Sequence, residues 1–472
     1  MKILFVEPPK EYWFIMGEYL PPPYSLLQLA AYVENVNKDV EISVLDCQAQ
    51  GIDWKHLENR IEDFSPDIVA ASSLATCNAY TTVRVLEAAK KVKPEVVTVT
   101  GGQHFTALAQ ESLQTYPCID IIVRGEGELT LAEMVHALAE GEELTTIKGL
   151  SYRVGDEIRH NLPRPLIENL DSLPFPGYRF VEDYLARYHF TMMTGRDARY
   201  MIVEGSRGCQ YDCTFCSQWP FWGRRWRPKS SKRIAEEMEY CHSKFGATFF
   251  WLTDDNFNLA RGKELAQEIT QRGLAEEIMW FVQARCDDVV DHSDVVSEMR
   301  RAGCYWMLLG VESGDPSTLR AFRKDGASEA KEAFRILSQN GIFGQGTFII
   351  GSRKDTTESI AGLREYASSL DPDLAIFMIL TPFPGTILYE EAEKEGWIED
   401  HNWANYDMVH AVMPTETLSR IEVQEELYKC YRNFYGSWPR RLKGIFSHNP
   451  LKRKTYRYLA SQNLLNELRT MF

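Results

Sequence analysis

Three cysteines lie close together in the segment GSRGCQYDCTFCSQW, where Cys209, Cys213 and Cys216 follow the pattern C-x3-C-x2-C. They come directly after a predicted buried strand, so one short loop carries all three thiols. Three thiolates on one loop can bind three irons of a [4Fe–4S] cluster and leave the fourth iron open to another ligand. The alternative is a zinc loop with a distant fourth ligand, for which Cys241 and His242 are the candidates.

The same segment resembles the radical S-adenosylmethionine superfamily. In that superfamily an aromatic residue, here Phe215, precedes the third cysteine and packs beside the adenine of the cofactor. The resemblance implies that the open iron binds S-adenosylmethionine. One electron from an external donor then cleaves it to a 5′-deoxyadenosyl radical, chemistry that is sensitive to oxygen and therefore anaerobic.

The resemblance also implies contacts to this cofactor at the ends of later strands. Gln283 and Arg285 end one predicted strand, and Glu312 and Ser313 end the next. For Glu312 and Ser313 the alternative is a cap on the following helix. The segment TPFPGT (381–386), which closes the sixth strand, also looks like relatives that carry a cobalamin domain.

Residues 1–130 alternate short apolar runs with helical spacing, which predicts a parallel, doubly wound Rossmann-like sheet of five strands. This region resembles the cobalamin-binding domain that precedes many radical S-adenosylmethionine barrels. Ligands of such sheets bind outside the carboxyl ends of the strands. The candidate cobalamin-binding residues at those ends are Ser72, Leu74, Thr76, Gly101, Gly102, Gln103, Gly125, Glu126 and Gly127.

One motif of the cobalamin enzymes is missing from this sequence. Many of them show D-x-H-x-x-G, whose histidine binds cobalt from below, whereas His104 follows GGQ in a different loop. The resemblance therefore implies a cobalamin whose benzimidazole is detached and whose cobalt has no histidine ligand. The alternative is a domain that binds nothing. A dinucleotide is excluded because no G-x-G-x-x-G follows the first strand.

Further strand–helix alternation follows a proline-rich segment with Pro163, Pro165, Pro174 and Pro176, which predicts an extended linker. Six repeats then predict a (β/α)6 partial TIM barrel with its chemistry at the carboxyl ends of the strands. The predicted strands are 199–206, 248–257, 277–286, 305–314, 343–351 and 374–383.

These patterns divide the chain into four parts. They are a cobalamin-binding domain (1–148), a hairpin and linker (149–195), a radical S-adenosylmethionine barrel (196–395) and a helical C-terminal region (396–472). We expect an amphipathic helix at 419–434. We also expect the helices after about residue 400 to border the substrate chamber.

Composition limits the classes of function. The chain of 472 residues carries a formal charge of −15 and has no apolar run long enough to cross a membrane. It begins without a signal peptide, so we expect a cytoplasmic protein. We expect no nucleic-acid partner, and we assign the basic stretches 223–233 and 440–457 to solvated loops or a barrel rim. The other seven cysteines are scattered, which indicates core residues or inert thiols.

The predicted function is a cobalamin-dependent C-methylation of an unactivated carbon. The C-terminal region from NWANYDMVHAV to YRNFYGSWPRR resembles the branch that holds the anaerobic magnesium-protoporphyrin monomethyl ester cyclase, together with methylases of hopanoids and of peptides. Within that branch a glutamine of methyl-coenzyme M reductase is the named substrate hypothesis. A protein, a peptide, a small molecule or a lipid all stay open as substrates.

Two alternatives remain. One is a radical oxidation or cyclisation without methyl transfer, as in the porphyrin cyclase. The other is a transfer-RNA methylthiotransferase, which needs a second triplet of cysteines, whereas Cys47, Cys77 and Cys118 are spread over three separate strand–loop regions.

Overall fold

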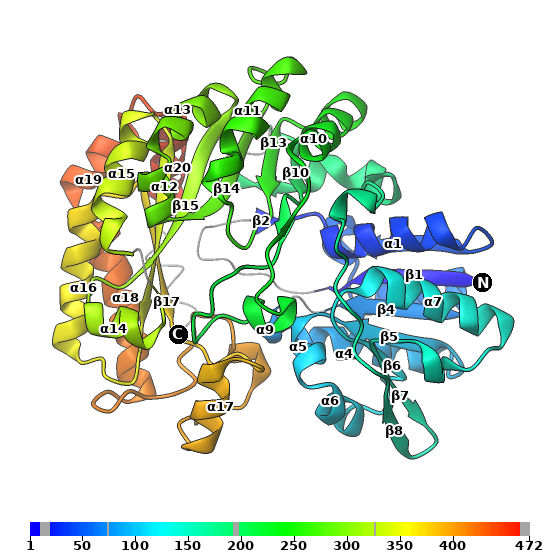
Figure 1. The fold of residues 1–472 in the computed structure, drawn as a ribbon. Helices are drawn as coiled ribbons and strands as arrows, with labels where there is room; N and C mark the ends of the chain where they lie inside the picture. The colour runs from blue at the N-terminus through cyan, green and yellow to red at the C-terminus, as the bar shows by residue number, and fades with distance from the viewer. Residues whose placement is uncertain (10–18, 73–74, 192–197, 325–326, 463–472) are drawn as a thin grey trace. The chain divides into compact units, whose positions relative to one another are not determined.

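The computed structural model describes residues 1–9, 19–72, 75–191, 198–324 and 327–462 (Figure 1). By its internal contacts the chain forms two compact units. The first holds residues 1–12, 20–187 and 220–223, and the second holds 13–19, 188–219 and 224–472. Each unit is built on its own β-sheet, and each is described by itself below.

The first unit has a seven-stranded sheet in the order β3-β1-β4-β5-β6-β7-β8. The first five strands in this order pair in parallel and confirm the predicted doubly wound sheet. The hairpin β7–β8 adds two antiparallel strands at the β6 edge. The strands are β1 (Lys2–Glu7), β3 (Glu41–Asp46), β4 (Ile68–Ser72), β5 (Val97–Gly101), β6 (Ile121–Val123), β7 (Leu150–Val154) and β8 (Glu157–His160).

Helices cover this sheet in two pairs. Helix α1 (Tyr24–Val36) packs against α7 (Gly127–Glu140), and α3 (Trp54–Phe64) packs against α4 (Ala79–Val92). Right-handed crossovers from a central first strand place such pairs on opposite faces of a sheet. The short helices α2 (Cys47–Gln50) and α5 (Gln103–Ala107) follow the ends of β3 and β5, and α6 (Ala109–Thr115) follows α5.

The proline-rich segment is fastened to the first unit. The N–H of Ile167 donates to Glu126 (2.6 Å), and the Gln28 amide donates to the carbonyl of Pro174 (3.1 Å). The N–H of Gly177 donates to the carbonyl of Leu27 (3.0 Å). The segment contains a 3-10 turn at Leu170–Ser172, and it is held along its length by the unit that it follows.

The second unit contains six parallel strands in chain order, β10-β13-β14-β15-β16-β17, which confirms the partial barrel. Every residue of β16 is buried, as expected for a strand covered on both faces. The strands are β10 (Tyr200–Val203), β13 (Phe249–Leu252), β14 (Met279–Arg285), β15 (Cys304–Glu312), β16 (Phe343–Ile350) and β17 (Leu374–Ile379).

Helices follow the strands along the outside of this barrel (Figure 1). Ser230 caps α10 at its start, and Gly246 ends it in the left-handed conformation that glycine adopts without strain. The helices are α10 (Ser231–Phe245), α11 (Gly262–Gln271), α12 (Cys286–Asp291), α13 (Ser293–Arg301), α14 (Pro316–Ala321), α15 (Ala330–Gln339), α16 (Thr357–Leu370) and α17 (Ile387–Lys394).

Three further helices complete the second unit. Helix α18 (Arg420–Gly436) begins at a capping box formed by Ser419 and Glu422 and packs on β17 and α16. Helices α19 (Trp438–Ile445) and α20 (Pro450–Gln462) follow it. The predicted amphipathic helix at 419–434 is therefore confirmed. No helix in the described part of the chain is both long and apolar enough to span a membrane.

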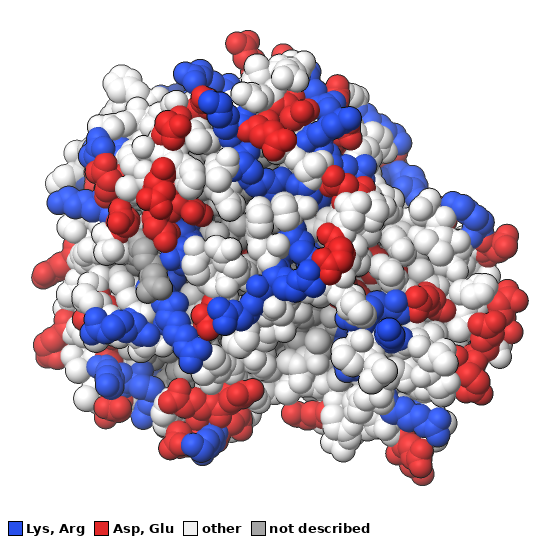
Figure 2. All heavy atoms as spheres, viewed as in Figure 1, with Lys and Arg blue, Asp and Glu red and all other residues white. Residues whose placement is uncertain are grey.

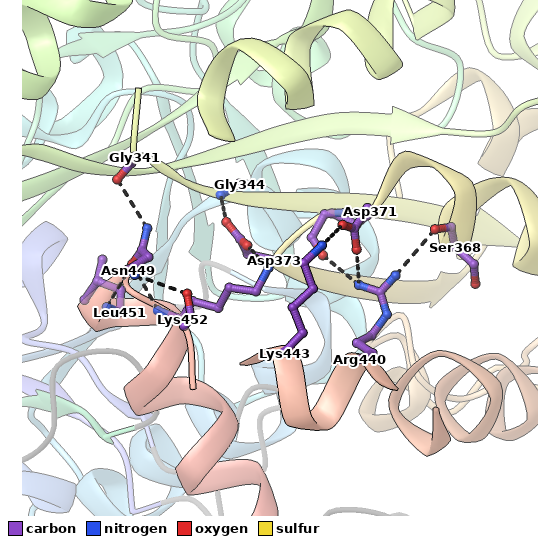
Figure 3. A network of polar contacts seen from close by, with 12 residues as sticks. Gly341, Gly344, Ser368, Asp371, Asp373, Arg440, Lys443, Asn449, Leu451 and Lys452 are labelled. Carbon is purple, nitrogen blue, oxygen red and sulfur yellow. Dashed lines mark hydrogen bonds and ion pairs between the residues drawn. The ribbon is translucent and has the colours of Figure 1, made fainter. Parts of the chain in front are cut away.

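Helices α19 and α20 contact the residues that precede β16 and β17 (Figure 3). Arg440 and Lys443 form ion pairs with Asp371 (3.2 and 2.6 Å), and Lys452 pairs with Asp373 (2.5 Å). These contacts lie at the amino ends of the strands, opposite to the carboxyl ends. Part of the basic stretch 440–457 is therefore an internal fastening rather than a solvated loop, and α19 and α20 lie away from the strand ends where the chemistry is expected.

The preceding segment does reach the carboxyl ends. The N–H of Ile379, at the end of β17, donates to the carbonyl of Met408 (2.8 Å). Arg353, just after β16, donates to the carbonyl of Pro414 (2.6 Å). Of the residues after about 400, those near 408–414 thus contact the carboxyl ends of β16 and β17, and their place beside the substrate chamber stays a prediction.

Candidate active site

The cysteine loop leaves the carboxyl end of the first barrel strand, β10. Ser206–Arg207 (β11) pairs antiparallel with Arg227–Pro228 (β12), so the chain between them is closed into a loop. All three predicted cysteines stand in this loop, and the N–H of Cys216 donates to the carbonyl of Cys213 (3.1 Å). The thiols therefore lie at the end of the barrel where this architecture carries its chemistry.

The three thiols suit iron. Burial raises the pKa of Cys209 and Cys213, and raises that of Cys216 to about 12. Without metal the thiols are protonated near neutral pH, so binding iron must displace their protons, as metal binding to cysteine does. In a [4Fe–4S] cluster each cysteine binds a different iron, so the thiols surround the cluster and do not converge on one ion.

The zinc alternative needs a fourth ligand beside the three cysteines. A zinc site needs several side chains gathered around a single ion. Among the residues that the structure describes, no three His, Cys, Asp or Glu side chains are placed to hold one metal ion. Cys241 is fully buried within α10, and Nδ1 of His242 lies 2.8 Å from the carbonyl of Ala247.

Two helix ends hold the cysteine loop. The N–H of Thr214 donates to the carbonyl of Phe322 after α14 (3.1 Å), and the ring of Phe215 meets that of Phe322 edge to face, 5.0 Å between centroids. The N–H of Leu388 in α17 donates to the carbonyl of Thr214 (3.1 Å). The segment TPFPGT (381–386) leads into α17, so it sets the position of this contact.

Arg285 and Gln283 lie two residues apart on β14 and share one face of the strand. The Arg285 guanidinium lies 3.8 Å from the ring centre of Tyr211 in the cysteine loop and pairs with Asp287 (2.9 Å). Gln283 is half-buried, and its amide lies 3.5 Å from the carbonyl of Asp254. The structure thus brings Arg285 to the cysteine loop, with Gln283 on the same side of the strand.

Glu312 ends β15 with a left-handed backbone (φ 62°), a conformation that is uncommon for residues other than glycine. Its carboxylate accepts hydrogen bonds from Nζ of Lys324 (3.1 Å) and from the hydroxyl of Thr347 (3.3 Å). Burial opposes the charge of Lys324, but the Glu312 carboxylate raises the pKa of this ammonium, which stays charged. Sequence reasoning missed Lys324, whose partner stands twelve residues earlier.

Ser313 belongs to the turn that follows. Its hydroxyl accepts the N–H of Asp315 (3.1 Å), and the Asp315 carboxylate caps α14 by accepting the N–H of Thr318 (2.8 Å). The helix-cap alternative is therefore right for the turn but names the wrong residue, because Asp315 is the cap. Glu312 is free of that role.

A network of buried charges supports the base of the cysteine loop. Glu204 pairs with Arg207 (2.8 Å), and Lys229 lies 3.2 Å from Glu237 and 3.7 Å from Glu204. The Lys229 side chain is 1% exposed. The expectation that the stretch 223–233 forms solvated loops or a barrel rim is thus wrong at Lys229, which follows β12 and is buried against Glu237 of α10.

The end of β13 adds two carboxylates to this base. Asp254 accepts a hydrogen bond from the Ser206 hydroxyl, and Asp255 accepts the N–H of Gly208, directly before Cys209 (3.0 Å). Burial raises the pKa of Asp254 to about 6. A Cβ on Gly205 would come within 2.3 Å of the Asp254 carboxylate, so only glycine fits there. The sequence TDD after a buried strand was the available signal for this pair.

In the first unit the candidate cobalamin-binding loops adjoin one another. Ser72 at the end of β4 pairs in register with Gly101 at the end of β5, and Gly101 pairs with Val123 at the end of β6. Thr76 is buried, and Gln103 opens α5. Leu74 lies outside the described residues.

The glycines differ in why they are needed. Gly102 and Gly125 have positive φ (93° and 72°), and an added Cβ on Gly125 would meet no atom within 4 Å. A Cβ on Gly101 would lie 2.7 Å from the carbonyl oxygen of Val123, and one on Gly127 would lie 2.9 Å from Leu29. Packing within the unit therefore explains Gly101 and Gly127, whereas Gly125 borders open space that a ligand can enter.

Three further side chains in this region are buried within the unit. Glu126 accepts the N–H of Ile167 and so anchors the proline-rich segment. His104 is 2% exposed within α5, and burial lowers its pKa to about 4, so it is neutral at physiological pH. Thr100, which sequence reasoning missed, is buried on β5 with a hydroxyl that has no partner among the described residues.

The isolated cysteines fall into the core as predicted. The described residues form no disulfide, and five of the seven cysteines outside the loop are buried. The remaining two, Cys77 and Cys118, are half-buried. These seven thiols stand on separate segments of the chain, unlike the three in the cysteine loop.

Comparison with known proteins finds a matching family for each of two parts of the chain. Residues 17–135 match the B12 binding domain, and residues 203–367 match the radical SAM superfamily. The uncharacterized methyltransferase PH0819 of Pyrococcus horikoshii is 33% identical over 95% of each chain. The anaerobic magnesium-protoporphyrin IX monomethyl ester cyclase of Cereibacter sphaeroides is 31% identical over 83% of this chain and 63% of its own.

Solved structures share the fold. The radical S-adenosylmethionine methyltransferase TsrM of Kitasatospora setae, determined with cobalamin and a [4Fe–4S] cluster, superimposes with a TM-score of 0.72 at 16% identity, covering 100% of this chain and 99% of its own. The cobalamin-dependent enzyme OxsB gives 0.71 at 16% identity over 100% and 72%. The chain is therefore a member of the cobalamin-dependent radical S-adenosylmethionine methyltransferases, with a [4Fe–4S] cluster, S-adenosylmethionine and cobalamin as its cofactors.

Proposed function

We propose that this enzyme methylates an unactivated carbon of its substrate. One observation carries the proposal: a three-cysteine loop closes the carboxyl end of the first strand of a six-stranded barrel, in a chain that also carries a B12 binding domain. When bound, the cofactors supply a 5′-deoxyadenosyl radical, which removes a substrate hydrogen, and a methyl group for the resulting carbon radical. The protein supplies their positioning.

We assign the cluster to Cys209, Cys213 and Cys216 and the neighbourhood of S-adenosylmethionine to residues around them. Arg285 contacts Tyr211 of the cysteine loop, and the ring of Phe215, in the same loop, packs against Phe322. In addition to these, Gln283, Glu312 and Ser313 are our candidates at the strand ends. The Glu312–Lys324 pair offers both a fixed anion and a fixed cation, a suitable match for the amine and carboxylate of an amino-acid moiety.

For cobalamin we assign the loops after β4, β5 and β6. Gly125 and Gly102 provide backbone conformations without side chains, and Ser72, Thr76 and Gln103 provide polar groups. Thr100 adds a buried hydroxyl that a ligand can satisfy. Gly101, Gly127 and Glu126 support these loops through packing and hydrogen bonding.

The experiment is an anaerobic incubation with S-adenosylmethionine carrying a deuterated methyl group, cobalamin and candidate substrates, read by mass spectrometry. A product that gains one labelled methyl supports the proposal. A glutamine-containing peptide of methyl-coenzyme M reductase is the first substrate, with asparagine in place of the glutamine as the control. The triple Cys209→Ala, Cys213→Ala, Cys216→Ala variant should bind no iron and form no 5′-deoxyadenosine.

We further propose that cobalt carries neither its benzimidazole nor a histidine. His104 is buried in α5 and lies within two residues of Gly102, a spacing that differs from the D-x-H-x-x-G arrangement. The electron resonance spectrum of the cobalt(II) form should show no hyperfine splitting from an axial nitrogen. Such a splitting would count against the assignment.

A radical cyclisation or oxidation is the second candidate, favoured by the 31% identity to the Cereibacter sphaeroides cyclase. The same incubation separates the two, because an oxidised product without label supports this second candidate. A transfer-RNA methylthiotransferase is disfavoured, because Cys47, Cys77 and Cys118 are spread over three separate strand–loop regions.

A further inference from the structure

The proposed chemistry makes no use of the basic stretch in α19 and α20. Residues 438–462, which cover both helices, contain seven Lys and Arg residues and no Asp or Glu, in a chain with a formal charge of −15. Over much of the face shown in Figure 2, by contrast, Lys and Arg side chains are interspersed with Asp and Glu. The seven cations of the stretch are Arg440, Arg441, Lys443, Lys452, Arg453, Lys454 and Arg457.

The two helices form a closely packed hairpin. A Cβ on Gly444 of α19 would lie 2.2 Å from the ring of Tyr456 of α20, so glycine is what allows the helices to approach this closely. In the turn between them the side chain of Asn449 accepts the N–H groups of Leu451 and Lys452 (3.0 and 3.1 Å). We refer to α19, α20 and this turn as the C-terminal hairpin, and these contacts fix the position of one helix against the other.

One side of the C-terminal hairpin is anchored to the barrel (Figure 3). Arg440 and Lys443 pair with Asp371, and Lys452 pairs with Asp373, so two aspartates bind three of the seven cations. Both aspartates precede β17, at the amino end of the strand. These ion pairs hold the hairpin in one orientation, and they therefore fix which of its side chains face away from the barrel.

The exposed side chains of the C-terminal hairpin are both apolar and basic. Leu442 and Phe446 stand four residues apart and share one side of α19. They are 52% and 73% exposed, which is unusual for large apolar side chains. Lys454 and Arg457 share one side of α20 in the same way, and both are exposed. Basic helices with exposed apolar side chains are typical of membrane surfaces, where the apolar groups enter the boundary between headgroups and acyl chains.

We infer that the C-terminal hairpin docks on a membrane surface that contains anionic lipids. Such a surface repels a protein of this net charge, and a local basic segment overcomes the repulsion at one face. Nucleic acid would use the same cations, because its binding depends on phosphate contacts, but phosphate contacts do not account for the exposed Leu442 and Phe446. Because the hairpin is anchored at the amino end of β17, docking there leaves the carboxyl ends of the barrel strands open.

The test measures co-sedimentation of the full-length protein with lipid vesicles and requires no catalytic activity. One set of vesicles contains equal parts of phosphatidylglycerol and phosphatidylcholine, and the other contains phosphatidylcholine alone. The apolar variant is Leu442→Ser/Phe446→Ser. Its control, Val36→Ser/Leu162→Ser, removes two apolar side chains of matching exposure (52% and 74%) from the first unit.

A second pair of variants tests the charge. Lys454→Glu/Arg457→Glu reverses two exposed cations of the C-terminal hairpin and leaves the ion pairs with the two aspartates in place. The control Lys55→Glu/Lys331→Glu makes the same change in net charge at exposed positions on α3 and α15. Thermal unfolding followed by circular dichroism shows whether each variant is folded, and if one hairpin variant fails to fold, the other decides.

The unaltered protein should bind the anionic vesicles and not the neutral ones, and high salt should weaken the binding. Each hairpin variant should bind about tenfold more weakly or worse, and each control should bind as the unaltered protein does. Failure of the unaltered protein to bind anionic vesicles overturns the inference, as does full binding by a folded hairpin variant. It is also overturned if the charge variant loses binding to RNA but not to vesicles, or if the apolar variant converts a dimer to a monomer and still binds vesicles fully.

Discussion

Tyr431 and Tyr435 stand one turn apart on α18 and bind alternate residues of the barrel's last strand, β17. The Tyr431 hydroxyl donates to the carbonyl of Phe377 (2.9 Å) and accepts its N–H (3.1 Å). The Tyr435 hydroxyl does the same at Ala375 (2.8 and 3.0 Å). Four helical residues rise about 6 Å and two strand residues about 6.6 Å, so the two spacings match.

This arrangement occupies the hydrogen-bonding groups of an edge strand without another strand. Burial raises the pKa of both phenols well above the ordinary range, so both stay protonated and can donate. An unpaired edge is a site for pairing with other chains, and proteins cover or block such edges. In this barrel a helix provides the cover.

Tyr431→Phe and Tyr435→Phe should each destabilise the second unit by about 2 kcal/mol, because each leaves a buried N–H and a buried carbonyl without a partner. Urea titration followed by circular dichroism measures the loss. Tyr428→Phe on the same helix is the control, and it should lose far less because its side chain is half-exposed. Equal losses of stability in all three variants would show that the hydrogen bonds from these hydroxyls to β17 do not stabilise the unit.

The space beside Gly125 can be tested with asparagine, which tolerates positive φ better than other residues with side chains. Gly125→Asn should fold, since no atom lies within 4 Å of the added Cβ, yet it should bind cobalamin at least tenfold more weakly. Gly141→Asn is the matched control, with φ 70° and equally open space at the far end of α7. Cobalamin absorbance after gel filtration gives the occupancy. Full occupancy in Gly125→Asn would place the cofactor elsewhere.

His104 should make the cofactor-free protein sensitive to acid. Because burial lowers its folded-state pKa to about 4, below an ordinary value near 6.5, the unfolded chain binds more protons between these values. Its contribution to stability is complete above about pH 6.5 and is lost as the pH falls towards 4, by about 3 kcal/mol. Calorimetric unfolding between pH 7 and 4 measures this.

The His104→Asn variant should unfold with a weaker dependence on pH than the unaltered protein. The exposed His136, in the same unit, provides the control variant His136→Gln. An unchanged pH profile in His104→Asn would mean that other groups cause the acid sensitivity.

Lys229 should be needed only because its partners are charged. Lys229→Met removes the ion-pair partner of the buried Glu237, while Glu204 keeps Arg207, and it should cost about 3–5 kcal/mol. Removing the Glu237 charge as well, in Lys229→Met/Glu237→Met, should recover part of that loss. A double-mutant cycle in urea measures the coupling. Additive losses would show that the two side chains do not act as a pair.

The sequence was sufficient for the architecture because buried strands leave a strong signal. FFWL, MWFVQAR and LAIFMI are short apolar runs separated by amphipathic helices, and each became a barrel strand. The cysteine triplet could be recognised equally well, since all three cysteines stand on one loop. In both cases the residues that form the pattern lie within a few positions of one another in the sequence.

Other parts could not be predicted because their partners are distant in the chain. Lys229 stands in a basic stretch that reads as solvated, and only the folded chain brings it to Glu204 and Glu237. The same holds for Arg440, whose partner Asp371 precedes it by many residues. The sequence also could not show why each glycine is needed. Gly101 and Gly125 look alike in sequence, but of the two only Gly125 borders open space.

The fastening of β17 by α18 and of its amino end by α20 has a consequence for synthesis on the ribosome. Strand β17 emerges well before Tyr431, Tyr435 and Lys452 have been made. At ordinary elongation rates of about 5–20 residues per second, its edge stays unpaired for some seconds. During that interval the nascent barrel presents a bare strand to neighbouring chains, so slowing translation of the last three helices should lower the yield of correctly assembled protein.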